Sequence, residues 1–216
     1  IRFNTPMLFA LAFLPMFGIG GLTGLPLGLN TSDIPLHDTY YVIGHFHYVV
    51  APGTIFALFA GIYYWFPKIT GRRMDEGLGK IHFFGSFIGM NVVFMPMFIQ
   101  GLAGVSRRLF DGGTTYLHAQ EVLHWNQFMT WSAILIGVSQ IPFIINCIKS
   151  IKGGEKVSAN PWDATTLEWT AAPSPPIAHG NFPDVPEVFR TAYEYNVPMN
   201  GSVKEFVPQN HPVEVK

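Results

Sequence analysis

Four long apolar runs that contain no Lys or Arg limit what this chain can fold into. They cover about residues 7–29, 40–66, 81–105 and 122–148. A helix needs about 20 predominantly apolar residues to cross a bilayer, and each run is long enough. Because the runs are continuously apolar and do not alternate, a transmembrane β-barrel is disfavoured. The sequence therefore predicts an all-α fold, a bundle of four membrane-spanning helices.

Composition agrees with a membrane domain followed by a polar tail. Of 216 residues, 49% are hydrophobic and 12% are charged, about half the charged fraction of an ordinary soluble domain. We expect residues 1–150 to hold the helices and residues 151–216 to form an extended tail on the cytoplasmic side, with at most short helices, for example near residues 186–193. The net charge is −1 and no basic cluster is present, so we expect no nucleic-acid partner. The single Cys147 excludes an internal disulfide and a cysteine-rich metal site.

The distribution of Lys and Arg predicts the orientation of the helices. Basic residues precede the first run, occupy the second connection and follow the fourth run, namely Arg2, then Lys68, Arg72, Arg73 and Lys80, then Lys149, Lys152 and Lys156. Because basic residues gather on the cytoplasmic side, both chain ends and residues 67–80 are expected there, or on the matrix side of an organelle. The connections that carry His37-Asp38 and Arg107-Arg108 then share the outer side.

Small residues and prolines punctuate the runs. Gly20, Gly24 and Gly28 are spaced four apart and predict a face for close contact with another helix. Each run also contains proline, and Pro15, Pro52, Pro96 and Pro142 lie inside the four runs in turn. Since proline removes one backbone hydrogen bond from a helix, we expect each of these positions to bend its helix.

Two histidines, His45 and His47, lie inside the second apolar run on either side of Phe46. Ionisable residues at membrane depth are costly and usually functional. Residues two apart on a helix point about 200° away from each other, so the two imidazoles cannot chelate one metal ion. They can each bind a different centre, for which planar porphyrins on both faces of the helix are suited, because imidazole is a common iron ligand. The alternative is a pair of core histidines that only hydrogen-bond to neighbouring helices.

Two charged pairs are expected on the outer side. His37 and Asp38 could ligate a hard or borderline cation at the membrane surface, although Asp38 or Thr39 could instead cap the following helix. Arg107 and Arg108 could bind carboxylates such as porphyrin propionates, or reach towards lipid headgroups. A basic pair on the outer side runs against the orientation tendency, which favours a bound anion.

Several motifs together resemble a known family. They are His37-Asp38-Thr39-Tyr40-Tyr41, His45-Phe46-His47-Tyr48, Gly20-Gly21-Leu22-Thr23-Gly24, Trp65-Phe66-Pro67-Lys68, Gly101-Leu102-Ala103-Gly104 and Asn160-Pro161-Trp162. Over about residues 1–182 the chain resembles subunit I of the heme-copper oxygen reductases, the cytochrome c oxidases in particular. The match implies the C-terminal part of that subunit, the last four of about twelve helices. Nothing after Phe182 contributes to the resemblance.

The resemblance implies a role for each site residue. His45 would be the catalytic, axial ligand of a high-spin heme, and His47 an axial ligand of a low-spin heme. His37 and Asp38 would be ligands of magnesium or manganese. Arg107 and Arg108 would contact the heme propionates, with Asp33 and Tyr40 in the hydrogen bonding around them. The copper ligands and the second ligand of the low-spin heme would lie upstream, outside this chain. The implied reaction is reduction of dioxygen to water with electrons from cytochrome c, coupled to proton translocation.

The same resemblance implies partners and a location. The partners would be the rest of subunit I, a copper-containing subunit II, subunit III, cytochrome c, dioxygen and membrane lipid. The location would be a bacterial inner membrane, or else the mitochondrial inner membrane. A quinol-oxidising relative is the first alternative, and Asp38 with Thr39-Tyr40-Tyr41 favours cytochrome c over it. A heme-carrying membrane module without catalysis is the second alternative.

Overall fold

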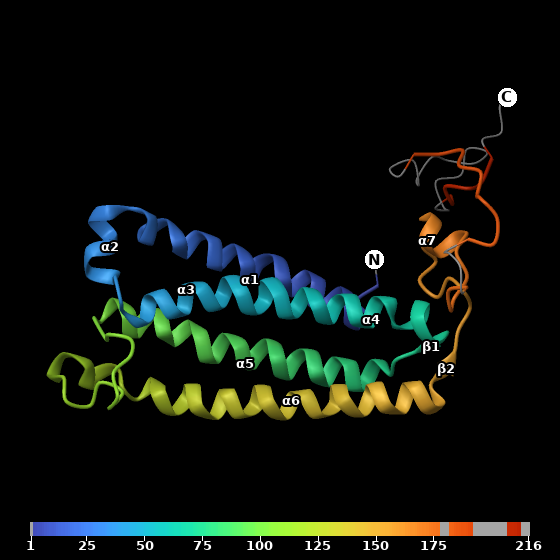
Figure 1. The fold of residues 1–216 in the computed structure, drawn as a ribbon. Helices are drawn as coiled ribbons and strands as arrows, with labels where there is room; N and C mark the ends of the chain where they lie inside the picture. The colour runs from blue at the N-terminus through green and yellow to red at the C-terminus, as the bar shows by residue number, and fades with distance from the viewer. Residues whose placement is uncertain (1, 178–181, 192–206, 213–216) are drawn as a thin grey trace. The chain divides into compact units, whose positions relative to one another are not determined.

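The computed structural model describes residues 2–177, 182–191 and 207–212. Its elements are α1 (Thr5–Gly28), α2 (Asn30–Leu36), α3 (Tyr40–Val50), the π-helix η1 (Ala51–Phe56), α4 (Ala57–Thr70), β1 (Arg72–Arg73), α5 (Glu76–Leu102), the 3-10 helix η2 (Leu117–Val122), α6 (Trp125–Gly153), β2 (Glu155–Lys156) and α7 (Leu167–Thr170). Four helical stretches are long and apolar enough to cross a membrane, and α3, η1 and α4 together form the second (Figure 1). The predicted all-α bundle of four spans is confirmed.

The helices α1 and α5 follow residues whose side chains accept hydrogen bonds from free backbone N–H groups. Asn4 Oδ1 accepts from Met7 N at 3.2 Å at the start of α1, and Asp75 Oδ1 accepts from Leu78 N at 2.9 Å at the start of α5. The two starts are joined, because Thr5 donates from both its backbone N and its hydroxyl to Glu76.

The second span changes its helix type at the proline expected to bend it. Pro52 lies in η1, between α3 and α4. Because proline has no N–H, the α-helical bond to the Tyr48 carbonyl cannot form. The chain continues through this point with a wider turn, a local change of the kind often found near functional sites.

The connections contain short helices that the apolar pattern did not predict, α2 before the second span and η2 before the fourth. The fourth span begins at Trp125, a few residues later than expected. In the tail, the short helix is α7, whereas the described residues 186–191 form none. The expected helix near residues 186–193 is therefore wrong for its described part, and its last two residues lie outside the description.

The described chain divides into two compact units, one of residues up to 62 with 75–147 and the other of residues 63–74 with 148 onward. In the first, α3 packs between α1 and α5 (Figure 1). Both contacts are close because glycine faces α3. A Cβ on Gly20 would come within 2.8 Å of the Tyr48 backbone, and one on Gly101 within 2.0 Å of Tyr41 N.

The helices α5 and α6 meet through polar side chains as well as apolar ones. His82 is fully buried, with Nε2 3.2 Å from Gln140 Oε1, and its ring stacks on Phe143. The hydroxyls of Ser86 and Ser139 are 3.0 Å apart. Buried polar groups of this kind need partners, and these partners hold the two helices in one register.

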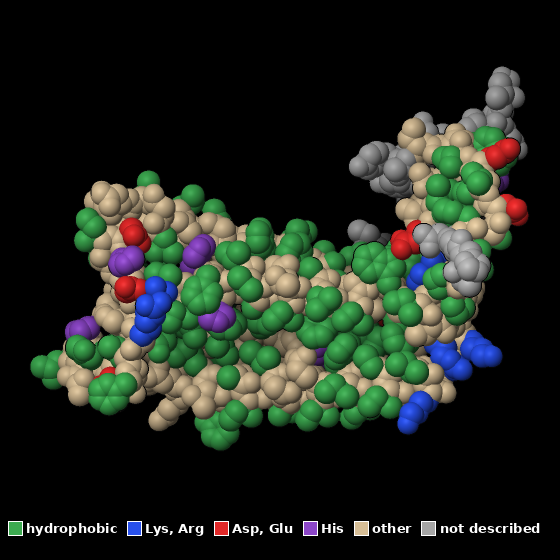
Figure 2. All heavy atoms as spheres, in the orientation of Figure 1, with side chains coloured by type: hydrophobic (Ala, Val, Ile, Leu, Met, Phe, Trp, Pro, Cys, Tyr) green, Lys and Arg blue, Asp and Glu red, His purple; other side chains and the backbone are tan. Residues whose placement is uncertain are grey.

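Apolar side chains cover the outward faces of the helices, as Figure 2 shows for one side of the molecule. On α6 they recur at helical spacing at Phe128, Trp131, Leu135, Val138, Ile141 and Ile145, each at least 41% exposed. In water such a surface would be unfavourable. It fits lipid or further helices, as a span in a membrane requires.

In the second unit, β1 pairs with β2 in antiparallel register, Arg72 opposite Lys156. The buried Lys68 of α4 donates to the Ala172 carbonyl at 2.8 Å and to the Glu168 carbonyl, with its ammonium 5.0 Å from the Trp169 ring centroid. These contacts hold α7 against the end of α4.

Candidate functional site

His45 points from α3 towards α1. Its Nδ1 lies 2.8 Å from the carbonyl oxygen of Gly20. A carbonyl can only accept, so Nδ1 carries the proton and Nε2 keeps its lone pair. Within the described chain no protein group bonds to Nε2. This nitrogen is therefore free to act as a ligand, and the carbonyl fixes both the tautomer and the ring plane.

The face of α1 that meets His45 is the small-residue face predicted for helix contact. A Cβ on Gly24 would lie 2.7 Å from His45 Cε1, whereas one on Gly28 would meet nothing within 4 Å. Thr23 lies between the glycines, with Oγ1 3.3 Å from His45 Nδ1. The glycine spacing indicated a close contact, but nothing in it identified an imidazole as the neighbour or Thr23 as part of the site.

His47 points the other way, towards α5. Its Nδ1 lies 2.8 Å from the Ile43 carbonyl one turn earlier in α3, so its Nε2 also keeps the lone pair, with no partner in the described residues. The ring stacks on Phe94 of α5, with centroids 4.4 Å apart and planes at 15°. Phe46 lies 4.4 Å away at 30°. Sequence reasoning did not identify Phe94, because no periodicity shows which α5 residue faces α3.

The two imidazole rings thus contact different helices, His45 with α1 and His47 with α5, as their spacing on one helix predicts. Phe46, between them in sequence, is 39% exposed. Each ring is held through Nδ1 by a carbonyl and offers Nε2 alone. Chemically, the pair can donate one axial nitrogen to each of two separate centres and cannot donate both to one.

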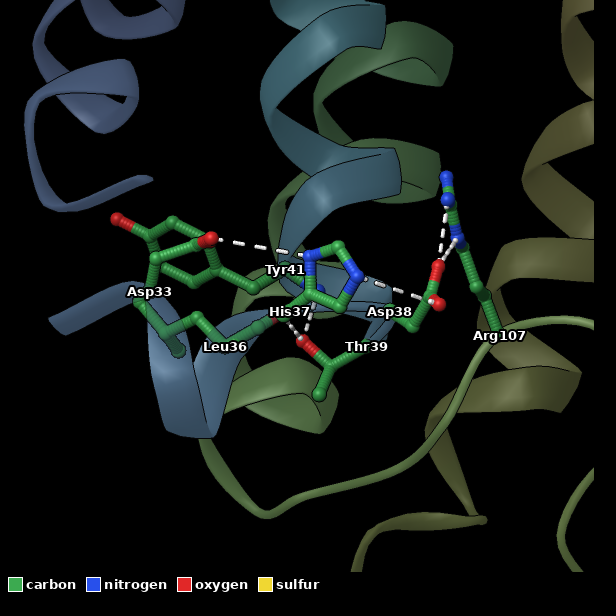
Figure 3. Close-up of polar contacts among 7 residues, drawn as sticks. All are labelled: Asp33, Leu36, His37, Asp38, Thr39, Tyr41 and Arg107. Carbon is green, nitrogen blue, oxygen red and sulfur yellow. Dashed lines mark hydrogen bonds and ion pairs between the residues drawn. The ribbon is translucent and has the colours of Figure 1, made fainter. Parts of the chain in front are cut away.

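A second cluster lies at the connection between α2 and α3 (Figure 3). His37 is flanked by two carboxylates, with Nδ1 3.7 Å from Asp33 Oδ2 and Nε2 3.5 Å from Asp38 Oδ2. Asp38 Oδ1 accepts from Arg107 Nε at 2.6 Å and lies 2.5 Å from Arg107 Nη2. The His37 and Asp38 side chains are 68% and 52% exposed, and that of Arg107 is 23% exposed. Most of the cluster therefore lies at the surface of the chain.

Backbone pairing brings this cluster together across the chain. Thr39 and Ser106 form an antiparallel bridge. Next to it, Arg107 N donates to the Asp38 carbonyl at 2.8 Å, and Tyr40 N donates to the Val105 carbonyl at 2.9 Å. Asp38 adopts a left-handed φ of 56°, which is uncommon outside glycine but tolerated by Asp. The ion pair therefore follows from the way the segment after α5 docks on the segment before α3.

Capping of α3 is done by Thr39. Its hydroxyl oxygen accepts from Tyr41 N at 3.2 Å and donates to the Leu36 carbonyl at 2.7 Å. Asp38 is left for Arg107 and His37. The hydrogen bond from Arg107 is the largest cause that holds the pKa of Asp38 below its ordinary value, with smaller contributions from the charges of His37 and Arg108.

The other predicted site residues are not drawn into this cluster by their side chains. Arg108 is exposed, with φ of 66°, and its guanidinium makes no hydrogen bond or ion pair with the described residues. Tyr40 joins only through its backbone. The described residues contain no group of three or more His, Cys, Asp or Glu able to hold a metal ion.

Comparisons with known proteins identify similar sequences over most of the chain. The cytochrome c and quinol oxidase polypeptide I family matches residues 1–137. An alternative cytochrome c oxidase subunit 1 of Bradyrhizobium diazoefficiens is 44% identical over 98% of this chain and 36% of its own length. A cytochrome c oxidase subunit 1 of Synechocystis sp. is 47% identical over 91% of this chain and 34% of its own length. The chain spans about a third of these relatives.

A similar fold occurs in a solved structure, a cryo-EM structure of a heme-copper terminal oxidase dimer. It aligns with a TM-score of 0.62 at 23% identity and covers 82% of this chain and 30% of that one.

Proposed function

Because this chain belongs to the cytochrome c and quinol oxidase polypeptide I family, we propose that it is the C-terminal part of the catalytic subunit of a respiratory terminal oxidase. The complete enzyme reduces dioxygen to water with electrons from cytochrome c and couples this to proton translocation. One observation carries the proposal above others. The His45 and His47 rings contact different helices, α1 and α5. Each has its Nδ1 bound to a carbonyl, which leaves one Nε2 as a ligand, as two separate hemes require.

The residues around each imidazole fit a heme ligand. A ligating histidine normally donates its second N–H to a carbonyl or carboxylate, which orients the ring and raises its basicity. His45 has the Gly20 carbonyl in this role and His47 has the Ile43 carbonyl. We assign His45 to a high-spin heme and His47 to a low-spin heme. The bound iron supplies the redox chemistry, while this chain holds the ligands in place.

Family membership implies heme and copper as cofactors and assembly into a complex of several subunits. The four apolar helices make the chain part of a multi-pass membrane protein. Beyond this we propose that copper is held upstream in subunit I, and that subunit II, which carries copper of its own, and subunit III are the neighbours. The bacterial relatives support a location in a bacterial inner membrane.

We assign His37 and Asp38 to a magnesium or manganese ion. The separation of 3.5 Å between His37 Nε2 and Asp38 Oδ2 is longer than a good hydrogen bond and leaves both atoms free to act as ligands. Magnesium retains several waters and needs only one or two carboxylates from a protein, so two protein ligands suffice. Arg107 occupies the other oxygen of Asp38.

Arg107 and Arg108 are assigned to the heme propionates. A guanidinium has five N–H donors. Arg107 uses Nε and Nη2 on Asp38 and keeps others for a second carboxylate, while Arg108 has no ion-pair partner within the described residues. Asp33 and Tyr40 complete the outer-side polar surroundings, with Asp33 acting through His37.

Replacing His47 tests the assignment of the hemes. In the complete oxidase, His47→Ala should remove the low-spin heme band from the reduced-minus-oxidised spectrum and leave the high-spin band, which carbon monoxide shifts. His45→Ala should do the reverse. Heme spectra unchanged in both variants would leave the pair with a structural role only.

Manganese tests the cation site independently of the hemes. Oxidase prepared with Mn²⁺ should show a bound Mn²⁺ signal in electron paramagnetic resonance, and Asp38→Asn should lose it. Glu121→Gln removes a carboxylate from the connection before α6 and serves as the control. A bound signal that survives both His37→Ala and Asp38→Asn would place the cation elsewhere.

A quinol oxidase is the second candidate, because the family includes quinol oxidases. The names of both relatives above and the sequence from Asp38 to Tyr41 favour cytochrome c. Purified complex supplied with each donor decides between them. Oxidation of quinol without oxidation of cytochrome c would overturn our choice.

A further inference from the structure

The His45 ring packs against one turn of α1, residues 20–24. Gly20 supplies the carbonyl at 2.8 Å from Nδ1, and Gly24 leaves room for Cε1, which a Cβ would approach to 2.7 Å. Thr23 places its hydroxyl oxygen 3.3 Å from the same Nδ1. The two glycines explain the close approach of the ring to α1. The Thr23 hydroxyl is not needed for that approach, so its position next to Nδ1 requires another explanation.

At this contact, the positions of the hydrogens follow from which groups can donate a hydrogen bond and which can only accept one. The Thr23 hydroxyl has one hydrogen, and the carbonyls of Ile19 and Gly20 lie 2.8 Å and 2.9 Å from its oxygen. That hydrogen goes to one of these carbonyls, since neither can donate. The lone pairs of Thr23 Oγ1 then face the N–H of His45. Nδ1–H thus has two acceptors, the Gly20 carbonyl and the Thr23 hydroxyl.

We propose that Thr23 is a positioning residue that acts through His45, holding its ring plane and strengthening the electron donation of Nε2. This rests on the proposed function, in which His45 Nε2 binds heme iron. An acceptor on the distant nitrogen makes an imidazole a stronger ligand. The Thr23 hydroxyl is the better acceptor because it donates in turn to a carbonyl, and hydrogen bonds linked in such a chain polarise one another. Losing the hydroxyl leaves Nδ1–H with one acceptor, so Nε2 donates less to the iron.

Three variants of the complete oxidase test this. Thr23→Val removes the hydroxyl at nearly constant shape, Thr23→Ser retains it, and Thr130→Val is the matched control. Thr130 Oγ1 donates to the carbonyl one turn earlier at 2.8 Å, as Thr23 does to Ile19, but no imidazole adjoins it in the described structure. The measurements are the iron–histidine stretching band in resonance Raman spectra of the reduced enzyme and the midpoint potential of the high-spin heme.

We expect Thr23→Val to shift the stretching band to lower frequency and raise the midpoint potential, and Thr23→Ser and Thr130→Val to keep both near wild type. An unchanged band in Thr23→Val, no rescue by Ser, or an equal shift in Thr130→Val would each overturn the proposal. If Thr23→Val lost its heme, the smaller Thr23→Ala would be measured instead, with the same expectations.

The proposed function fails in a different way. If the wild-type band is absent, or persists in His45→Ala, then His45 is not the iron ligand and the heme assignment itself is wrong. If the wild-type band is present and His45→Ala loses it while Thr23→Val leaves it unchanged, only the role of Thr23 is refuted.

Discussion

At the scale of single residues, His45 and His47 are restrained in different ways although only Phe46 separates them. His45 rests on a backbone carbonyl of another helix, whereas His47 bonds within its own helix and depends on rings for its orientation. Phe94 and Phe46 lie at equal centroid distances from the His47 ring. The plane of this imidazole is therefore set by packing against aromatic faces together with the Ile43 hydrogen bond. Each aromatic pair contributes about 0.5–1.5 kcal/mol.

Replacing Phe94 should allow the plane of the His47 ring to change its orientation. We expect Phe94→Leu to shift or broaden the low-spin heme g-values in electron paramagnetic resonance, because these depend on the ligand plane, while Phe94→Tyr preserves them. Phe84→Leu, at an exposed phenylalanine of the same helix, is the control. Identical g-values in Phe94→Leu and wild type would show that the Ile43 hydrogen bond alone sets the plane.

Asp111 organises the connection between α5 and α6. Its carboxylate accepts from the Thr115 hydroxyl at 2.6 Å, from the N–H groups of Gly113 and Thr115 at 3.0 Å and 2.9 Å, and from the Thr114 hydroxyl. These bonds, the Thr115 hydroxyl first, hold the pKa of Asp111 well below its ordinary value. Because the folded pKa is depressed, the stabilisation is complete above the ordinary pKa of about 3.9 and is lost as pH falls through the folded value.

The amides of Gly113 and Thr115 should therefore stay protected down to about pH 4 and lose protection only in stronger acid. Asp111→Ala should speed their hydrogen exchange at neutral pH as well, since both lose their acceptor. Hydrogen-exchange mass spectrometry of the complex measures this, with Glu121→Gln as control. Protection that already disappears near neutral pH would contradict the role of the carboxylate.

At the scale of elements, α3 owes its position to glycines on both neighbouring helices. Gly20 and Gly24 leave room for the close approach of α1 to α3, and Gly101 leaves room for the close approach of α5. The Gly101 contact is with the backbone N of Tyr41, at the first turn of α3, and neither backbone can yield cheaply. This approach also sets the distance between α3 and the segment that carries Arg107.

Gly101→Ala should consequently destabilise the bundle by about 1–3 kcal/mol or more, the usual cost of overpacking a filled core. Gly137→Ala on α6 is the matched control, because its Cβ would meet nothing within 4 Å, and alanine should be neutral or slightly stabilising there. Thermal unfolding of the solubilised complex gives the comparison. Equal midpoints for the two variants would show that α3 and α5 can separate without loss.

At the scale of the whole molecule, the chain contributes one imidazole to each proposed heme and two ligands to the proposed cation. On this proposal, the second ligand of the low-spin heme and the copper ligands come from the upstream part of the subunit. The helices are also open to partners, since their outward faces stay apolar and exposed. The distribution of Lys and Arg predicts that the cluster of His37, Asp38 and Arg107 faces the outer side of the membrane.

Orientation can be tested with single cysteines in a Cys147→Ala background. Leu117→Cys lies in the exposed connection before α6 and Lys156→Cys follows α6. In intact cells a membrane-impermeant maleimide should label the first and spare the second, and in inverted vesicles the reverse. Labelling of Lys156→Cys in intact cells would invert the predicted topology.

Local properties of the sequence were enough to predict the four spans and the divergence of His45 and His47. A span depends on the length of an apolar run, and the direction of a side chain depends on the helical repeat, and both are properties of consecutive residues. The small-residue face at Gly20 and Gly24 was also readable, because its spacing is helical. A bend was predicted at Pro52, and the π-helix found there was not.

Only the tertiary structure decided which residues of other helices and connections contact these side chains. Asp38 and Arg107 are 69 residues apart in the chain, and Phe94 lies on a different span from His47. Such pairs depend on the register between helices, which many side chains set together and no periodicity encodes. The sequence by itself determined that two imidazoles leave one helix in opposite directions. The packing of α1 and α5 decided that Thr23 would accept from one of them and Phe94 would support the other.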